Sequence, residues 1–448
     1  MKLLRILLIV MLFGMGPSLA QAAGWRVGIA RADITPQGQI WMAGYAARNH
    51  PSEGVLHPLW AKALAVEDQH GSRVVIVTTD LIGLSRTIAE AVCARAQQQT
   101  GIPRARVLLN SSHTHSGPVV GDVAEVAYRL DPEQAAVVGA YTKTLQDKLV
   151  AVIAQAIENL KPGELAYGEG KATFGMNRRS LREKSYVIGP NPAGPVDPAV
   201  PVLAVRDAEG RLVGILFGYA CHNTTLAIYQ ISGDYAGFAK IALEKAHPGA
   251  DALFMIGCGA DTNPQPRGTV ELAEQHGNAL AAAVDQALAG EMHPLEGTLA
   301  VAFGRVDLPL VDPPSREEIK ELESSKDTYR QRLGKKLAER LEKGEPIPTS
   351  CSCPVQVVRF GDDLSLVALG GEVVVDYALR LRKEFPAKRL WIAGYSNDVF
   401  AYVPSERVLA EGGYEAGGAM VYFGIHGPFK PGLEDRIINQ VKQLMAEK

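Results

Sequence analysis

The sequence predicts an α/β protein with a mixed central sheet, helices on the faces of the sheet, and a metal site at the rim where strands end. Hydrophobic runs of strand length alternate with helical patterns from Trp25 to about Pro428, and no Pro/Ser-rich linker divides them. Five runs end shortly before a residue that can do chemistry, at residues 74–77, 106–110, 213–217, 253–256 and 364–369. Because ligands of open α/β sheets bind beyond the carboxyl ends of the strands, we expect these residues to meet at one rim.

The expected elements follow one another along the whole chain. Strand patterns predict strands at residues 25–36, 40–45, 59–68, 165–174, 200–205, 212–220 and 355–360. Helical spacing predicts helices at residues 87–99, 131–160, 236–247, 270–288 and 373–381. Glu372 is expected to start the last of these helices. The first helix ends before Gly101, and the second, one long helix or a pair, ends before Pro162, because these residues do not continue a helix.

Residues 313–346 form a charged helical insertion in this pattern. The segment is rich in Glu, Lys and Arg, carries apolar residues at helical intervals, and is opened by Pro313 and closed by Pro346. Charged helical runs are usually solvated faces, so we expect a helix pair on the surface. A lid over the functional site is the alternative interpretation.

Residues 1–22 are typical of a secretory signal peptide of bacterial type, with a basic start, a short apolar run and small residues before the expected cleavage point. The apolar run is too short to cross a membrane comfortably, and no later run is long enough. We expect a secreted or periplasmic protein without a transmembrane segment after cleavage, folded as a single domain over residues 24–448. An uncleaved anchor is the less favoured alternative.

Composition excludes nucleic acid as a partner and does not decide whether the cysteines form disulfides. The formal net charge is −3 and the basic residues form no stripe, so nucleic-acid binding has no electrostatic basis. Five cysteines are an odd number, so at least one is free or pairs between chains. Cys221 and Cys258 both follow predicted strands and are candidates for a disulfide; burial as free thiols is equally consistent with the pattern.

The strongest chemical pattern is His-Thr-His at residues 113–115, which follows a buried strand and precedes Ser-Gly-Pro. On an extended segment, His113 and His115 would point to the same side. Two imidazoles there can share a metal ion, or one can bind it while the other serves as acid or base. A single histidine is more often a core residue, but two at this spacing favour a functional site.

Later segments end at the same expected rim. His222 follows a predicted strand, and Glu372 follows two glycines at a predicted helix start, where the helix dipole also favours a carboxylate. Asp261 and Asn263 lie in an Asp-Thr-Asn-Pro loop that can present backbone N–H groups to an oxyanion, although such turns are common. Asp80 is interpreted either as the partner of a metal-bound histidine or as a helix cap. The cluster is a candidate metal-hydrolase site.

Short motifs follow one another through nearly the whole mature chain. They are Asp-Ile-Thr-Pro at 33–36, Met-Ala-Gly-Tyr at 42–45, Gly-Val-Leu-His-Pro-Leu-Trp-Ala-Lys-Ala-Leu at 54–64, Ser-His-Thr-His-Ser-Gly-Pro at 112–118, Asn-Arg-Arg at 177–179, Cys-His at 221–222, Gly-Asp-Tyr-Ala-Gly at 233–237, Asp-Thr-Asn-Pro at 261–264, Glu372, Ala-Tyr-Val at 401–403 and Gly-Tyr-Glu at 413–415. In this order they resemble the neutral (non-lysosomal) ceramidases, a family of zinc amidases. The ordered series is more specific than any single motif.

The resemblance implies a role for each matched residue. The implied ligands of one Zn²⁺ per chain are His113, His222, Glu372 and Tyr402. His115 is implied to lie beside the substrate, Arg178 and Tyr414 to contact its amide end, and Gly44 to supply a backbone contact. The loop after the fourth run is expected to bind substrate through Asp261 and to take part in catalysis through Asn263.

We therefore expect a zinc-dependent amide hydrolase that cleaves N-acylsphingosine, or a related lipid amide, to a fatty acid and an amine. Zinc lowers the pKa of a bound water from about 15.7 to about 7, which provides hydroxide for attack on the carbonyl carbon. His115 would carry the proton to the leaving nitrogen, and Tyr414 and Arg178 would stabilise the oxyanion.

Two departures from the family keep other functions open. Asn263 stands where the ceramidases carry a serine, which admits an exported binding protein that has lost activity. We also expect no C-terminal sandwich domain, because little sequence follows Tyr414, and this admits a metal-dependent amidase or esterase of soluble acyl compounds. Ligands of the His, Glu and Tyr types are also compatible with nickel or iron.

Overall fold

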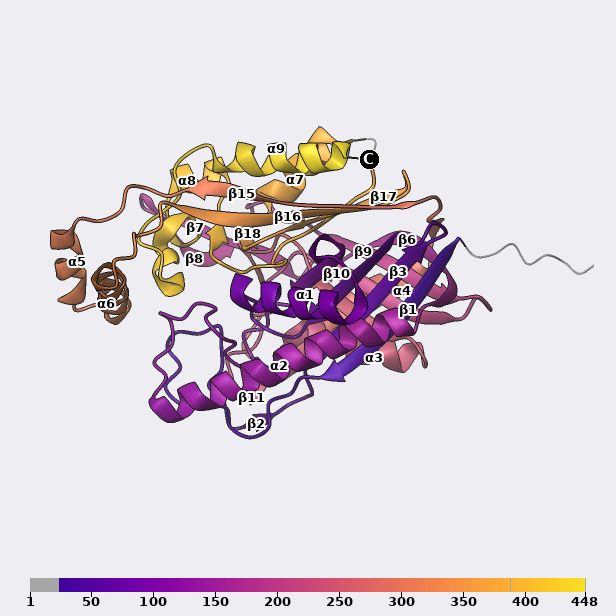
Figure 1. Ribbon diagram of the computed structural model, residues 1–448, viewed down its shortest axis with the longest axis horizontal. Helices are drawn as coiled ribbons and strands as arrows, with labels where there is room; N and C mark the ends of the chain where they lie inside the picture. Colours follow the sequence, from indigo (N-terminus) through magenta and orange to yellow (C-terminus); the bar gives the residue numbers. More distant parts are fainter. Residues whose placement is uncertain (1–23, 387, 448) are drawn as a thin grey trace, which may run out of the picture.

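The hydrophobic runs of the first two thirds of the chain form a nine-stranded mixed sheet in the computed structural model, which describes residues 24–386 and 388–447 (Figure 1). In spatial order the strands are β12 (Asp251–Ile256), β10 (Leu212–Tyr219), β9 (Ala199–Asp207), β6 (Lys161–Lys171), β1 (Trp25–Asp33), β3 (Trp60–Asp68), β4 (Arg73–Thr79) and β5 (Val107–Ser111), with β14 (His293–Pro294) against β6. Only β12–β10 and β4–β5 are parallel among these described pairs. The predicted mixed α/β class is confirmed, and the predicted signal peptide at 1–22 lies outside the described residues.

The carboxyl ends of β5 and β10 meet, although the strand order makes these two strands run in opposite directions across the sheet. A sheet twists by about 20–25° from strand to strand, so this many strands turn through well over a right angle and bring the two edges together. The amide of Ile256 at the end of β12 donates to Asn110 in β5 over 3.2 Å. Beyond the strands, Thr114 and Asn223 pair as parallel neighbours. Twist, and not a parallel strand order, therefore gathers the strand ends.

A second sheet packs against the first and was not foreseen from the sequence. Its strands are β15 (Leu299–Pro309), β16 (Ser350–Phe360), β17 (Leu364–Leu369) and β19 (Leu390–Ala393). One hydrophobic core joins the sheets, with Leu64 and Leu253 from the first and Leu366 and Trp391 from the second. The last of the five hydrophobic runs thus lies in this second sheet.

Helices cover the sheets from outside. They are α1 (Arg86–Thr100), α2 (Pro132–Glu158), α3 (Asp234–Ala246), α4 (Val270–Ala289), α7 (Asp376–Glu384), α8 (Glu406–Glu411) and α9 (Leu433–Ala446), with short turns η1 (Arg104–Arg106), η2 (Tyr414–Gly418) and η3 (Met420–Phe423). Separate cores hold α1 and α2 on β3 and β4, α3 and α4 on β9, β10 and β12, and α7 and α9 on the second sheet. Figure 1 shows α9 along the outer side of β15 and β16. As predicted, α1 ends at Gly101, which has a left-handed φ of 76°.

The charged segment folds as α5 (Arg316–Glu323) and α6 (Thr328–Glu342), which lie at one end of the molecule (Figure 1). A capping box between Ser315 and Glu318 starts α5. The pair has a small hydrophobic core of its own, made of Ile319, Leu333, Leu337 and Ile347. Ile319, Leu333 and Leu337 are apolar positions at helical spacing within the otherwise charged sequence, and Ile347 follows α6.

The expected helix start at Glu372 is wrong. Glu372 lies in β18 (Glu372–Val373), which pairs with β20 (Tyr402–Val403), and α7 begins only at Asp376. The amide of Glu372 donates to the Ala401 carbonyl over 2.8 Å. Three consecutive valines follow Glu372, and β-branched residues favour the extended backbone, so the pairing prevails over the helical pattern.

The remaining strands form small ladders near the strand ends. They are β2 (Gly54–Val55) with β11 (Gln230–Ile231), and β13 (Thr262–Pro264) with β7 (Gly175–Arg182) and β8 (Ser185–Asn191). All five cysteines lie within the described residues as free thiols, so Cys221 and Cys258 form no disulfide. Among the described helices, none combines the length and the apolarity that crossing a membrane would take.

A segment after β19 connects the two sheets. The side-chain amide of Asn110 donates to the Gly394 carbonyl over 2.9 Å, and the amide of Asn397 donates to the Leu109 carbonyl over 2.7 Å. Asp398 follows, and its carboxylate accepts from the amide of Arg86 over 3.0 Å. Burial raises the pKa of Asp398 to about 7, although Arg305 opposes the shift.

We expect Asp398 to make the stability of the fold depend on pH. Because the folded state holds a proton that the unfolded chain releases, the free energy of unfolding should fall by about 2–4 kcal/mol as pH rises from about 4 to about 7. Asp398→Asn should remove this part of the pH dependence. The free energy of unfolding of the variant should therefore rise relative to that of the wild type as pH increases from about 4 to about 7. Denaturant titrations of both proteins measure it, and a constant difference between them would contradict the assignment.

Candidate metal centre and its cavity

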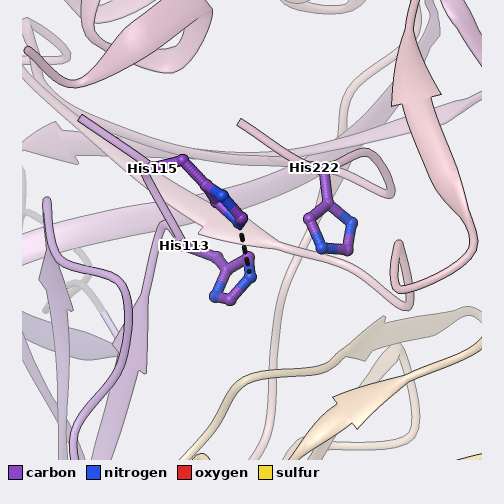
Figure 2. A group of neighbouring side chains, drawn as sticks. All are labelled: His113, His115 and His222. Atoms are coloured by element: carbon purple, nitrogen blue, oxygen red, sulfur yellow. Dashed lines mark hydrogen bonds between the residues drawn. The ribbon is translucent and has the colours of Figure 1, made fainter. Parts of the chain in front are cut away.

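His113 and His115 lie just beyond β5, but not on an extended segment as expected. Strand β5 ends at Ser111, and His113 has a left-handed φ of 60°. The bend still brings the imidazoles together, with their Nε2 atoms 3.1 Å apart, and Figure 2 shows the ring of His222 beside them. Each of the three imidazoles offers a nitrogen within 4.8 Å of the other two, and all three are buried.

Backbone carbonyls fix the rings of His113 and His222. Nδ1 of His113 lies 2.6 Å from the Ile82 carbonyl oxygen, and Nδ1 of His222 lies 2.7 Å from that of Gly259. A ring nitrogen at such a distance from a carbonyl must carry the proton and donate it. The Nε2 atoms, which are the nitrogens left for a metal, therefore face the centre, and this is the arrangement that metal-binding histidines have.

Asp80 acts on this centre only through the backbone. Its carboxylate forms an ion pair with the buried Lys240 and accepts from the amide of Trp60 over 2.8 Å. Ser85 caps α1 in its place. Both expected roles of Asp80 are therefore wrong: its ion pair anchors the segment that carries the Ile82 carbonyl.

Glu372 and Tyr402 reach the same centre from the second half of the chain. Oε2 of Glu372 lies 3.1 Å from Nε2 of His113 and 3.2 Å from Nε2 of His222. The hydroxyl of Tyr402 lies 3.4 Å from Nε2 of His222. Burial alone would raise the pKa of Glu372, but the two imidazoles hold it well below its usual range. Burial, followed by Arg178, lowers the pKa of His222 to about 4, so the site pairs a charged carboxylate with neutral imidazole.

His115 differs from the other two histidines. Among the described residues, nothing bonds to its buried Nδ1. Burial, and then His113 and His222, hold the pKa of His115 well below its usual range. Metal ligands almost always donate their second ring N–H to an acceptor, so this ring is better suited to exchange a proton than to hold a metal.

The donor set fits a zinc ion. Two atoms bound to a tetrahedral zinc at about 2.0–2.1 Å stand about 3.3 Å apart. The distances that join His113, His222, Glu372 and Tyr402 are 3.1, 3.2 and 3.4 Å. Neutral imidazoles and an ionised carboxylate are also the protonation states that bind metals. The four residues assigned by resemblance as ligands are thus brought together, and their role as ligands stays a prediction.

Arg178 belongs to a buried network behind Tyr402. Its guanidinium donates to Tyr402 over 3.0 Å, to Glu415 over 2.8 Å and to the side-chain oxygen of Asn263 over 3.3 Å. Glu415 also accepts from Arg179 over 2.7 Å. Neither Arg178 nor Asn263 is among the residues that line the cavity, and the predicted roles of both in catalysis stay predictions.

The structure does not place Asp261 at the cavity. Its two carboxylate oxygens accept from the amide of Val375 over 2.9 Å and from the side chain of Asn177 over 3.1 Å. Burial raises the pKa of Asp261 to about 6. These bonds tie β7 to the segment after Glu372, and the predicted contact of Asp261 with substrate stays untested.

An apolar cavity of about 220 Å³ opens onto the centre. Gly44, His113, His115, Glu372, Tyr402 and Tyr414 form its polar end. The rest is apolar or aromatic and comprises Tyr45, Ala46, Ala47, Ile82, Val123, Ala124, Ala127, Tyr128, Val399, Tyr422 and Phe423. The amide of Gly44 donates to the Tyr128 hydroxyl over 3.0 Å, which positions the Gly44 turn against His115.

Several residues at the site were not singled out from the sequence. Glu415 neutralises two adjacent buried arginines, and the Arg-Arg pair was the available signal, because buried charges require partners. Tyr395 packs its ring 4.4 Å from that of His113, with a left-handed φ of 50°. Tyr128 and Tyr422 reach the cavity from segments that carried no chemical motif, so only the fold could find them.

Comparison with known proteins gives one family. The model described as "Neutral/alkaline non-lysosomal ceramidase, N-terminal" matches residues 25–301. The chain is 32% identical over 237 residues to a neutral ceramidase of Pseudomonas aeruginosa, which covers 50% of this chain and 34% of that relative. It is 27% identical over 241 residues to one from Drosophila melanogaster, covering 50% and 33%. The match thus spans about a third of these relatives.

Solved structures show the fold. The crystal structure of the Pseudomonas aeruginosa neutral ceramidase superimposes with a TM-score of 0.72 at 23% identity, over 95% of this chain and 76% of that one. A ceramidase complexed with C2 gives the same TM-score and coverage at 21% identity. The likeness therefore extends beyond the matched sequence to nearly all of this chain.

We predict that His113→Ala abolishes stoichiometric zinc binding, whereas His115→Ala keeps it. His113 presents a fixed Nε2 to Glu372, while the ring of His115 has no such anchor. Metal analysis after equilibration with zinc and removal of the excess measures this. His276→Ala, which removes a buried imidazole bonded to the Pro266 carbonyl, serves as the control. Loss of zinc from both site variants would instead indicate three histidine ligands.

We also predict that Gly44→Ala disables the site without removing the metal. A Cβ at Gly44 would lie 2.5 Å from Cγ of His115, so the ring must move. Gly38→Ala is a matched control, because Gly38 has a similar left-handed φ of 81° against 95° but open space around it. Metal content and turnover are measured for both variants, so that the collision with His115 is distinguished from backbone strain. Equal turnover of Gly44→Ala and Gly38→Ala would contradict the prediction.

Proposed function

This chain belongs to the neutral/alkaline non-lysosomal ceramidase family, and from that premise we propose that it is a zinc-dependent amidase of N-acyl lipids. The proposed reaction is hydrolysis of the amide bond of N-acylsphingosine, or a related lipid amide, to a fatty acid and an amine. The proposed ligands of one zinc ion are His113, His222, Glu372 and Tyr402. The signal pattern of residues 1–22 supports a place of action outside the cytoplasm, which N-terminal sequencing of exported protein tests.

One observation carries the proposal. Two imidazoles, one carboxylate and one phenol come from four distant parts of the chain and are linked by contacts of 3.1, 3.2 and 3.4 Å at the end of an apolar cavity. A buried group of this kind is costly to assemble unless it holds a partner such as a metal ion. A cavity that is apolar except at that end suits a substrate with a hydrocarbon chain and one polar bond to be cleaved.

The residues around the centre have different proposed roles in catalysis. When bound, a zinc ion supplies a Lewis acid and lowers the pKa of water to about 7. His115 starts neutral, since burial and its neighbours depress its pKa, so it can accept a proton and pass it to the leaving nitrogen. Tyr414 lines the cavity 5.3 Å from the ring of Tyr402, where its hydroxyl can donate to the oxyanion.

Arg178 has a positioning role in this proposal. Its nitrogen atoms are occupied by Tyr402, Glu415 and Asn263, so it holds the Tyr402 hydroxyl at the centre and adds positive charge near it. Asn263, which stands where the family carries a serine, contributes an oxygen to Arg178 and does not line the cavity. The substitution is therefore compatible with activity.

A second candidate is a metal-dependent amidase or esterase of short, soluble acyl compounds. The cavity of about 220 Å³ lies below the range of about 300–1,000 Å³ typical of sites for larger ligands, which favours a small substrate. A binding protein without activity is the remaining alternative. The same experiment separates all three.

We predict that removal of metal with a chelator abolishes hydrolysis of N-acylsphingosine and that zinc restores it. The assay follows release of fatty acid, with a series of soluble short-chain amides and esters in parallel. Nickel and iron add-back establishes whether zinc is specific.

The outcomes are distinct. Turnover of short amides or esters alone would favour the second candidate, and metal binding without any turnover would favour a binding protein. Full activity of the metal-free protein would overturn the zinc proposal. Glu372→Gln, which keeps the size of the side chain but removes its charge, should behave like chelated protein, whereas Glu384→Gln on the outer helix α7 should not.

A further inference from the structure

The charged helix α6 touches the cavity walls from outside. Tyr329 donates through its hydroxyl to the Ala46 carbonyl over 3.0 Å. Arg332 donates to the carbonyls of Val126 and Ala127 over 3.1 and 3.4 Å. Ala46 and Ala127 both line the cavity. Two wall segments far apart in the sequence are therefore held by neighbouring turns of one helix.

A third part of the cavity wall is aromatic, and Tyr329 contacts it as well. The ring of Tyr329 packs edge-on against Tyr422 at 5.0 Å, Tyr422 lies 6.2 Å from Tyr414, and Tyr414 lies 5.3 Å from Tyr402. These four tyrosines form a row that runs from the surface helix to the candidate metal centre. The outer and inner pairs are edge-on and the middle pair is tilted; edge-on pairs at such distances are attractive, so the outer ring supports the position of the inner ones.

An ion pair and a hydrophobic contact complete the attachment of α6. Lys336 pairs with Glu125, which precedes the Val126 carbonyl bonded by Arg332. Val421, next to Tyr422, packs against the small core between α5 and α6. The charged segment is therefore more than a solvated face, because its inner side bonds to the cavity segments of Ala46 and Ala127 and packs against Tyr422.

We propose that Tyr329 and Arg332 are specificity-determining residues that restrict the cavity to a single short, unbranched acyl chain. The inference rests on the proposed function and adds the substrate class to it. The walls that these residues join come from three separate segments. The segments bond directly to one another, through the amide of Gly44 to the Tyr128 hydroxyl and the amide of Val126 to the Tyr422 carbonyl, and α6 adds the outer bonds that limit how far they can stand apart. Without them, the walls can separate and admit a longer or branched chain.

The test uses N-acyl amides of one amine with short, medium and long straight chains and one branched chain. Tyr329→Ala and Arg332→Met should raise the ratio of kcat/KM for long or branched chains to that for short chains by about tenfold. Tyr329→Phe keeps the ring contact with Tyr422 but loses the bond to Ala46, so its effect should be smaller. Lys335→Ala, an exposed residue of the same helix, should leave the ratio unchanged.

A second measurement does not depend on turnover. Binding of a fatty-acid series to each folded variant, checked by thermal melting, should show the same shift toward longer chains. An unchanged ratio and unchanged binding in Tyr329→Ala and Arg332→Met would overturn the inference. If the wild type hydrolyses no N-acyl amide, the proposed function fails, and the fatty-acid series alone then decides the role of α6.

Discussion

The bonds from Nδ1 of His113 and Nδ1 of His222 to backbone carbonyls are the constraint on which the candidate site depends. Each bond fixes a tautomer and turns Nε2 toward Glu372. The carbonyls belong to Ile82 and Gly259, three residues beyond the ends of β4 and β12, so backbone next to the sheet sets the tautomer and orientation of each ring. A side chain on a loop alone would not be held in this way.

Buried charges keep that backbone in place. Helix α3 contributes two such contacts. Lys240, in the middle of the helix, pairs with Asp80 before the Ile82 carbonyl, and the carboxylate of Asp234, at its start, accepts from the amide of Leu226 over 2.8 Å, shortly after His222. Arg178 and Glu415 do the same for Tyr402. Breaking a buried pair leaves one uncompensated charge and costs about 3–5 kcal/mol, so such networks specify one arrangement strongly.

The two packed sheets explain why the site has two unlike halves. The twisted first sheet supplies the histidines, and the ladder of β18 and β20, whose strands follow β17 and β19 of the second sheet, supplies Glu372 and Tyr402. The segment after β19 joins the sheets through Asn110 and Leu109, directly before the His-Thr-His turn. The apolar cavity forms where these parts meet, and helix α6 bonds to two of its wall segments from outside.

The sequence by itself determined the mixed α/β class, most of the element positions and the identity of the residues at the centre, because strand and helix periodicities and a series of ordered motifs are local properties. His113, His222, Glu372 and Tyr402 were named from it through a resemblance, and they converge in space. What only the tertiary structure decided is non-local. The twist that brings β5 to β10, the pairing that holds Glu372 in a strand, the ion pair of Asp80, and the bonds of α6 to the cavity walls each join residues far apart in the chain. Local pattern carries no information about such partners, since the free energy that selects them comes from burial and pairing in the folded state.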